Sequence, residues 1–566
     1  MTAKSAGSIN SPQAGGITSM KPFAATAFVS ALLTIASTQA EAGILPERVA
    51  NAARESVADG MYQTLVFGVV DGDRSEIVSF GKLDNGKAPT GDTGYEIGSI
   101  TKTFTATLLA QDVLSGRVTL DTPVSKLLPD FTIPSRDGKQ ITLGEIGTQH
   151  SGLPRMPSNF FPKDPANPYA DYDAAKMKAF LAGYQLPRDP GASYEYSNLA
   201  FGLLGYALAR SNHLSYGELV KQRILDPLGM SMSGTSFTQA MRAHLASGHD
   251  ENGKPAGNWD FEALAGAGAI RSTADDMLRY LKANMGVKRT SLDPAMKFAQ
   301  QPRLAIDNGM RIGLAWMTTD KGIVWHNGGT GGYRSFIGFT TDWRHGVVIL
   351  TNTAVGVDEL GFAVLDPEAK LTPPKKAITL PAASLDAYVG TYKLADNFFL
   401  KVFRSGDDLI TQATGQGPVP IFASAPDEFF VKSAPISLTF HRNANGQVDG
   451  LTLHQNGDHF APKLSAADLP PEPKQVTLDA ATLGDYVGKY QFESGPILDI
   501  TRSGDQLSAQ LTAQPSAPIY PSAKDQFFYK IVDAQLTFER DAAGRIIAVV
   551  LHQNGRDQRA ARIAEH

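Results

Sequence analysis

The 566-residue chain contains no cysteine, and this absence restricts how it can fold and which metals it can hold. Without thiols it forms no disulfides, carries no lipid on a cysteine and offers no thiolate to zinc. Its 11 histidines form no His-Glu-x-x-His pattern, so a zinc-protease helix is not predicted. A Gly-x-Ser-x-Gly sequence is missing as well, which disfavours an α/β-hydrolase.

An excess of basic charge is also missing. The chain has 52 Lys and Arg residues against 57 Asp and Glu, a formal net charge of −5, and no basic cluster. Nucleic acid is therefore not an expected partner. The length that remains after a leader peptide, about 520 residues, predicts more than one domain.

The sequence lacks an apolar run long enough to span a membrane. A lysine precedes the apolar stretch at 23–36, and small residues follow it. This pattern predicts a secretory signal peptide rather than a transmembrane helix, with a retained N-terminal anchor as the alternative. We place the signal at 1–42, with cleavage after Ala40 or Ala42 and Met20 as an alternative start. We therefore expect an exported protein, periplasmic or extracellular, without a transmembrane span once the signal is removed.

Three short motifs are present in a fixed order: Ser99-Ile-Thr-Lys102, Tyr196-Ser-Asn198 and His326-Asn-Gly328. Together they contain a nucleophilic hydroxyl, two groups that can move its proton, an amide that can hold a substrate and a glycine-rich edge. Those parts are sufficient for covalent acyl transfer without a metal.

Local structure decides which Ser-x-x-Lys motif can act. Ser79 and Lys82 form a second copy, but they lie in an alternating segment that predicts a strand, where they would diverge. Ser99 instead follows a glycine and opens a helical pattern over 100–114, so Lys102 lies beside its hydroxyl. Taken alone, an ordinary helix cap and a solvated lysine would explain the motif.

The other two motifs have structural explanations when each is taken alone. Tyr196 and Asn198 project to the same side just before a helix predicted over 199–209. Packing of the tyrosine and helix capping by the asparagine would also explain them. His326 begins a glycine-rich loop between strands, where a substrate backbone can approach closely, although a core or turn histidine fits equally well. No helix starts after this loop, which argues against a nucleotide site.

In this order, the three motifs resemble those of the serine penicillin-recognising enzymes, specifically the class C β-lactamase-like branch. That branch contains β-lactamases, low-molecular-weight D-Ala-D-Ala carboxypeptidases and endopeptidases, D-aminopeptidases and some esterases. His326 stands where β-lactamases and carboxypeptidases usually have the lysine of Lys-Thr-Gly, as in D-aminopeptidase-like relatives, which weighs against a strong β-lactamase. The resemblance covers roughly 45–355 and includes further segments in family order: 148–155, 196–205, 227–230 and 266–277.

The resemblance implies acylation and deacylation at Ser99. Tyr196, held as a phenolate by Lys102, would take the serine proton and later pass it to the leaving group. Backbone N–H groups of Ser99 and Gly329 would form the oxyanion hole, and losing one such donor typically costs ~3 kcal/mol. Water would then release the acyl group, with no metal or organic cofactor. The implied substrate-binding residues are Asn198 for an amide, His326 for a carboxylate or for modulating Tyr196, and the edge glycines Gly328 and Gly329.

The same resemblance implies an α/β catalytic domain over 43–372, of β-lactamase/transpeptidase type. It would have an antiparallel sheet flanked by helices plus a helical lobe, with the site at the seam of the two lobes. The segments expected to share the sheet are 66–70, 77–80, 323–325, 335–339 and 347–350.

Beyond a linker near 371–376 the chain repeats itself. Four segments recur at a constant offset of 98 residues, for example Arg404-Ser-Gly-Asp and Arg502-Ser-Gly-Asp. A constant offset indicates one fold duplicated without net insertion. His454 and His552 recur with it and are expected to be structural. Short alternating segments with Gly and Asn turns predict two small all-β, barrel-like domains, 377–466 and 475–566.

We therefore predict an exported serine hydrolase that forms an acyl-enzyme at Ser99. The preferred hypothesis is a carboxypeptidase- or aminopeptidase-type enzyme acting on D-amino-acid-containing or cell-wall peptides. An esterase or weak class C-type β-lactamase using the same site is one alternative. A penicillin-binding or sensory protein that acylates without turnover is another. The expected partner is a small peptide, ester or β-lactam, and no oligomeric state is predicted.

Overall fold

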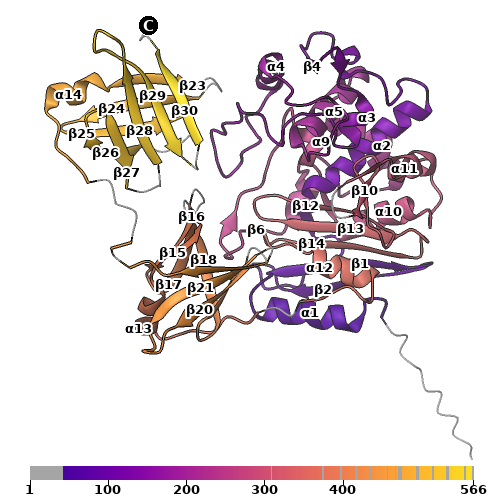
Figure 1. Cartoon of the computed structure of the whole chain (residues 1–566). Helices are drawn as coiled ribbons and strands as arrows, with labels where there is room; N and C mark the ends of the chain where they lie inside the picture. The colour runs from indigo at the N-terminus through magenta and orange to yellow at the C-terminus, as the bar shows by residue number, and fades with distance from the viewer. Residues whose placement is uncertain are drawn as a thin grey trace, which may run out of the picture. The chain divides into compact units, whose positions relative to one another are not determined.

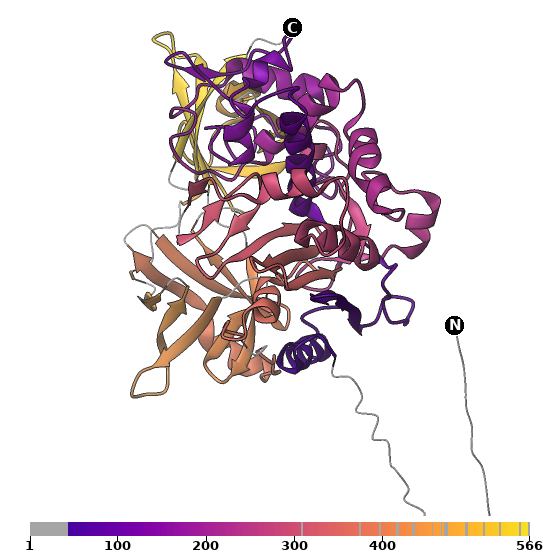
Figure 2. The ribbon, with the colours of Figure 1, turned by 90° about the vertical axis from the view of Figure 1, so that its right-hand side faces the viewer.

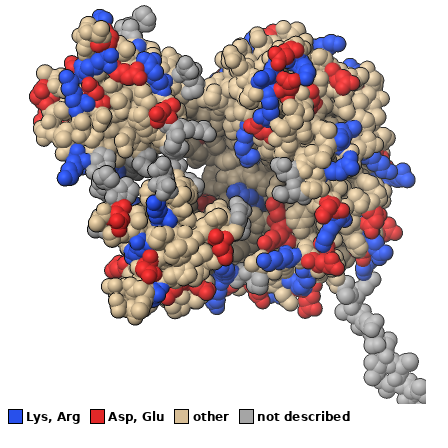
Figure 3. Space-filling view, viewed as in Figure 1, with Lys and Arg blue, Asp and Glu red and all other residues tan. Residues whose placement is uncertain are grey.

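The computed structural model describes residues 43–563 apart from short gaps, and Figure 1 shows its elements. The expected signal peptide, residues 1–42, and residues 469–473, between the two predicted β domains, lie outside the described residues. No helix in the described ranges has the length and apolar character needed to cross a bilayer. On the face seen in Figure 3, acidic and basic side chains of these ranges are interspersed. The gaps are 307–308, 373–374, 396–397, 415–417, 433–435, 456, 466, 469–473, 493–495, 513–515, 531–533 and 554–555.

An eight-stranded antiparallel sheet forms the centre of the catalytic region, in the order β2-β1-β14-β13-β12-β11-β10-β9. It contains every segment that the sequence assigned to this sheet, so that prediction is confirmed. Its strands are β1 Thr64–Asp71, β2 Arg74–Gly81, β9 Leu304–Ala305, β10 Arg311–Ile312, β11 Met317–Thr318, β12 Ile323–Gly329, β13 Arg334–Thr340 and β14 His345–Thr351.

Helices cover both faces of this sheet because strand residues alternate between two cores. Val66 and Val70 of β1 join the core formed with α2, α5 and α10, whereas Phe67 and Val69 join the one formed with α1 and α12. Figures 1 and 2 show α1 on the face opposite the helical lobe. The helices of this region are α1 Glu47–Ala58, α2 Thr101–Leu114, α3 Leu143–Gly147, α4 Ala174–Gly183, α5 Asn198–Ser211, α6 Tyr216–Val220, α7 Asp226–Leu228, α8 Gln239–His244, α9 Ala265–Gly268, α10 Ala274–Met285, α11 Asp293–Gln300 and α12 Asp358–Leu365.

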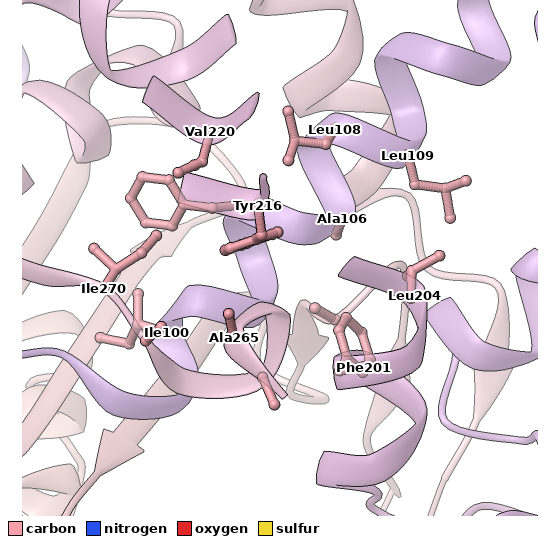
Figure 4. Close-up of a cluster of buried hydrophobic side chains, with 14 of the residues drawn as sticks. Ile100, Ala106, Leu108, Leu109, Phe201, Leu204, Tyr216, Val220, Ala265 and Ile270 are labelled. Carbon is pink, nitrogen blue, oxygen red and sulfur yellow. The ribbon is translucent and has the colours of Figure 1, made fainter. Parts of the chain in front are cut away.

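Helix α2 is buried on nearly all sides although four of its first seven residues are threonines. Thr103 and Thr107 satisfy their hydroxyls within the helix, donating to the carbonyls of residues 100 and 103 at 2.8 and 2.9 Å. Apolar side chains of α2 pack against those of α5, α6 and α9 (Figure 4). Everything on the first turn of α2, including Lys102, is therefore withdrawn from water.

The short pair β3 Gly94–Glu96 and β8 Arg271–Thr273 joins the two lobes at the site. Strand β3 leads directly into the 3-10 turn Gly98–Ile100 and then α2, while β8 follows α9. This pairing brings the segment before Ser99 next to the segment after Ala267, although they are far apart in sequence.

Two eight-stranded antiparallel β units follow the catalytic region, which confirms the predicted barrel-like fold. In the second, β23 and β30 pair and close the barrel; in the first, an isolated bridge between Tyr392 and Lys463 links the outer strands. Each unit has its own apolar core, separate from those of the catalytic region. The strands are β15 Gly390–Ala395, β16 Phe398–Ser405, β17 Asp408–Ala413, β18 Val419–Ala425, β19 Glu428–Val431, β20 Ile436–Arg442, β21 Val448–His454 and β22 Asp458–Pro462, then β23 Gly488–Phe492, β24 Ile497–Ser503, β25 Gln506–Leu511, β26 Ala517–Ala523, β27 Gln526–Tyr529, β28 Ala534–Arg540, β29 Ile546–Gln553 and β30 Arg556–Ile563, with the short helices α13 Ala382–Leu385 and α14 Ala480–Asp485.

The repeated histidines make the same contacts in both units. His454 lies between Thr439 Oγ1 at 3.0 Å and Asp458 Oδ1 at 2.7 Å. His552 lies between a threonine Oγ1 at 2.9 Å and the Asp557 Oδ1 at 2.7 Å. Each histidine thus links three neighbouring strands, and these contacts support the structural role expected for it.

Candidate active site

Ser99 lies in the 3-10 turn that precedes α2, and the backbone of this turn requires a glycine at position 98. Gly98 has a φ of +49°, a conformation that costs other residues about 1–2 kcal/mol. A Cβ on Gly98 would lie 2.5 Å from the backbone nitrogen of Gly329 on β12. The close approach of these two backbones places Ser99 at the end of β12. The competing serine, Ser79, lies in strand β2, as expected.

Lys102 joins the first two motifs. Its side chain is fully buried, and its Nζ lies 2.9 Å from Ser99 Oγ, 2.8 Å from Asn198 Oδ1 and 2.8 Å from the Ala267 carbonyl oxygen. Burial, and secondarily the charge of Arg155, hold the Lys102 pKa well below its usual value of 10.5. A neutral amine would use its two N–H groups on the two carbonyl oxygens, which can only accept. Its lone pair would then face the serine hydroxyl, as a general base requires.

Tyr196 is hydrogen-bonded to Ser99, so the phenol also contacts the nucleophile. Its pKa is nevertheless raised above 10, because burial outweighs the hydrogen bond from Ser99 and the charge of Arg155. The phenol therefore keeps its proton at neutral pH. Burial thus acts against the expected phenolate held by a charged Lys102, and the roles of the two groups stay a prediction.

The side chain of Asn198 contacts other residues of the site and does not cap helix α5. The side chain of Ser197 caps α5 by accepting from the Ala200 N–H at 2.9 Å. Asn198 is thereby free to accept from Lys102 through Oδ1, while its Nδ2 lies 3.3 Å from the hydroxyl of Tyr169. Tyr169 was not identified from the sequence, where it lies in a proline-rich loop without a recognisable pattern.

His326 is 1 % exposed, and its Nδ1 lies 2.6 Å from the carbonyl oxygen of Asn327, so Nδ1 carries the proton. Burial, followed by the charge of Lys102, lowers its pKa to about 3, against the opposing effect of the Asn327 hydrogen bond. The imidazole is neutral at physiological pH. A neutral imidazole would meet a substrate carboxylate only as a hydrogen-bonding group. The ring centroid lies 6.4 Å from that of Tyr196, which fits the alternative role beside the phenol, and the choice between the two expected roles stays a prediction.

The glycine edge of β12 packs directly on the segment that carries the nucleophile. A Cβ on Gly328 would lie 2.0 Å from the Ile97 carbonyl oxygen, and Ser335 of β13 donates to the same oxygen at 2.9 Å. Only glycine fits at this crossing. The structure thus brings all three sequence motifs together. Within the described ranges, no three His, Asp or Glu side chains converge as a metal-ligand set.

The beta-lactamase family model matches residues 49–364, which is more than half of the chain. This chain belongs to the beta-lactamase family. A second model, a domain of unknown function (DUF3471), matches 374–468 and 472–562, the two β units. The family, the relatives and the shared fold together identify the protein as a serine hydrolase.

Relatives of this family member include penicillin-binding protein 4 of Amycolatopsis lactamdurans, 26 % identical over 50 % of this chain and 79 % of that protein. The D-alanyl-D-alanine-carboxypeptidase/endopeptidase AmpH of Escherichia coli is 28 % identical over 48 % of this chain and 74 % of its own length. The crystal structure of a beta-lactamase/D-alanine carboxypeptidase from Pseudomonas syringae matches with a TM-score of 0.51 and 21 % identity, covering 58 % of this chain and 100 % of that one. This last likeness shows a shared fold.

Proposed function

We propose that the protein is an exported peptidase that forms an acyl-enzyme at Ser99 and cleaves D-amino-acid-containing peptides, such as cell-wall fragments. The observation that carries this proposal is the buried Lys102 Nζ, 2.9 Å from Ser99 Oγ and held by two carbonyl acceptors. The carboxypeptidase/endopeptidase activity in the name of one relative supports the choice of substrate. Export is proposed from the leader-like sequence before residue 43.

In the proposed acylation step, neutral Lys102 takes the Ser99 proton as the serine oxygen attacks the substrate carbonyl carbon. The oxyanion that forms accepts hydrogen bonds from the backbone N–H groups of Ser99 and Gly329. The Tyr196 phenol donates its proton to the leaving amine and is reprotonated by the Lys102 ammonium. This order gives each buried group a charge only transiently, in agreement with the direction of both pKa shifts.

In deacylation, a water molecule attacks the acyl carbon while Lys102 takes its proton through the same contacts. Collapse of the second tetrahedral intermediate breaks the bond to Ser99 Oγ, which recovers a proton from the ammonium. Water then appears in the product acid, and the enzyme returns to its starting protonation state. This step distinguishes a hydrolase from a protein that is acylated without turnover.

Purified protein lacking residues 1–42 tests the proposal with four substrates: an acyl-D-Ala-D-Ala peptide, a D-alanine amide, nitrocefin and a short-chain ester. The proposal predicts the highest kcat/KM on a D-amino-acid substrate. Preference for nitrocefin or the ester would instead indicate a β-lactamase or an esterase. Stoichiometric labelling without steady turnover on all four would indicate a penicillin-binding or sensory protein.

A further inference from the structure

The neutral state of His326 leaves the glycine edge without the cation that a lysine there would provide. Two arginines lie nearby but are already engaged. Arg334 donates through Nη1 to the carbonyls of Thr330 and Tyr333 at 2.6 and 2.8 Å; burial lowers its pKa, against the opposing charges of Glu251 and Asp358. Arg271 is 2 % exposed and bonds to two carbonyl oxygens and the carboxylate of Asp260.

Arg155 is placed differently. It lies in the loop between α3 and α4, and its carbonyl oxygen accepts from the N–H groups of Asn198 and Leu199 at the start of α5, at 3.0 and 3.3 Å. Its guanidinium carbon lies 5.1 Å from the centroid of the Tyr196 ring. The side chain is exposed, and among the residues that the structure describes it makes no hydrogen bond and no ion pair. Its charge reaches the reacting groups: it adds to the effect of burial in lowering the Lys102 pKa, and it opposes the effect of burial that raises the Tyr196 pKa.

We propose that Arg155 is a specificity-determining residue that binds a carboxylate on the leaving group of the substrate. This inference rests on the proposed function, in which Tyr196 protonates the leaving amine. In an amino acid the carboxyl carbon is about 2.5 Å from the amine nitrogen, through a single Cα. A cation next to Tyr196 is therefore next to the α-carboxylate of a C-terminal residue as it departs.

The chemistry of arginine fits this role. Guanidinium presents a planar fork of donors that matches a carboxylate and keeps its charge throughout the working pH range. Because Arg155 has no described anionic partner, a substrate carboxylate displaces no existing ion pair when it binds. An amide or ester leaving group would leave the guanidinium solvated and gain nothing from it. The enzyme should accordingly prefer substrates with a free C-terminal carboxylate.

The test compares acyl-D-Ala-D-Ala with acyl-D-Ala-D-alaninamide, which differ only in that carboxylate. Arg155→Gln should lower the acid-to-amide ratio of kcat/KM by about tenfold or more, as expected for a charge-assisted hydrogen bond. Arg155→Lys should retain part of the preference. The matched control is Arg54→Gln, because Arg54 is also exposed, with its guanidinium carbon 5.9 Å from the centroid of the Phe80 ring. That control should leave the ratio unchanged.

A purely structural role for Arg155 would lower the rates on both substrates equally and keep their ratio, which would overturn the proposal. Binding to Ser99→Ala provides a readout that does not depend on turnover. Its Kd for the acid should be lower than for the amide, and adding Arg155→Gln should remove most of this difference. Equal or absent binding of the two peptides would refute the role of Arg155. Hydrolysis that survives Ser99→Ala would refute the acyl-enzyme instead.

Discussion

Replacing Gly98 with alanine tests whether the contact between the nucleophile turn and β12 positions the oxyanion hole. The new Cβ would lie 2.5 Å from the Gly329 nitrogen, whereas ordinary Cβ contacts begin at 3.4 Å, so one backbone must move by about 0.9 Å. The variant also places alanine at a φ of +49°. The backbone conformation costs about 1–2 kcal/mol, and the overpacking adds about 1–3 kcal/mol.

Gly116→Ala is the matched control. Gly116 follows the same helix α2 with a φ of +75°, but a Cβ there meets nothing within 4 Å. That variant carries the backbone cost without the clash. Both variants should lower the free energy of unfolding, and Gly98→Ala should do so more, as measured by urea denaturation.

The effect on catalysis should separate the two variants much further. A displacement near 1 Å at an oxyanion donor is expected to cost about 10²-fold in kcat or more. We expect Gly98→Ala to lose at least that factor on the best substrate and to react far more slowly with a fluorophosphonate at Ser99. Gly116→Ala should remain within a few-fold of wild type. Equal activity of the two variants, with Gly98→Ala folded, would refute the role of this contact.

Four further outcomes are expected. Ser99→Ala should abolish turnover and labelling by a fluorescent penicillin, while Ser79→Ala should retain both; labelling that persists in Ser99→Ala would contradict the nucleophile assignment. In the proposed mechanism neutral Lys102 is the base, so kcat/KM should rise with pH through a pKa well below 10.5, and an acid limb that shifts little in Lys102→Arg would oppose this. Because the His326 pKa is about 3, the affinity of Ser99→Ala for substrate should not titrate near pH 6.5; a titration there that disappears when His326→Gln is added would contradict this. A chain of residues 43–372 should fold and label at Ser99, because among the described residues the apolar cores of the catalytic region include none beyond Leu371; failure to obtain it folded would show that the β units complete that core.

Periodicity and motif order were sufficient to predict most of the fold. The family resemblance predicted the central sheet and its strand segments, and the strands pair as one sheet in which β1 is buried on both faces. The constant offset between the repeats predicted two similar β units. It could not predict that only the second closes by pairing β23 with β30, because closure depends on the lengths of the last strands. Strand β22 spans Asp458–Pro462, whereas β30 spans Arg556–Ile563.

The residues of the site were predictable from their motifs, but their charge states were not. The low pKa of Lys102 arises from the packing of α5 and α9 around it, and the Ala267 carbonyl that it contacts is 165 positions away. Sequence spacing contains no measure of such burial. Arg155 was missed for the opposite reason, since an exposed arginine in a loop has no periodic neighbours. Asn198 was expected to cap its helix or bind substrate, yet the adjacent serine supplies the cap.

The burial of Lys102 restricts the charges that the rest of the site can carry. A charged ammonium at 0 % exposure would need a carboxylate, and no described carboxylate lies within 4 Å of its Nζ. The buried Glu96 is directed to other groups: its Oε1 accepts from the Trp259 N–H at 2.9 Å and lies 3.8 Å from Arg271. Desolvation therefore favours the neutral amine.

A second buried cation, such as a lysine at position 326, would repel any charge that forms on Lys102 during acylation. The neutral His326 avoids that repulsion, and in the proposed mechanism the exposed Arg155 binds an anion from the solvent side at a smaller desolvation cost than a buried cation would incur.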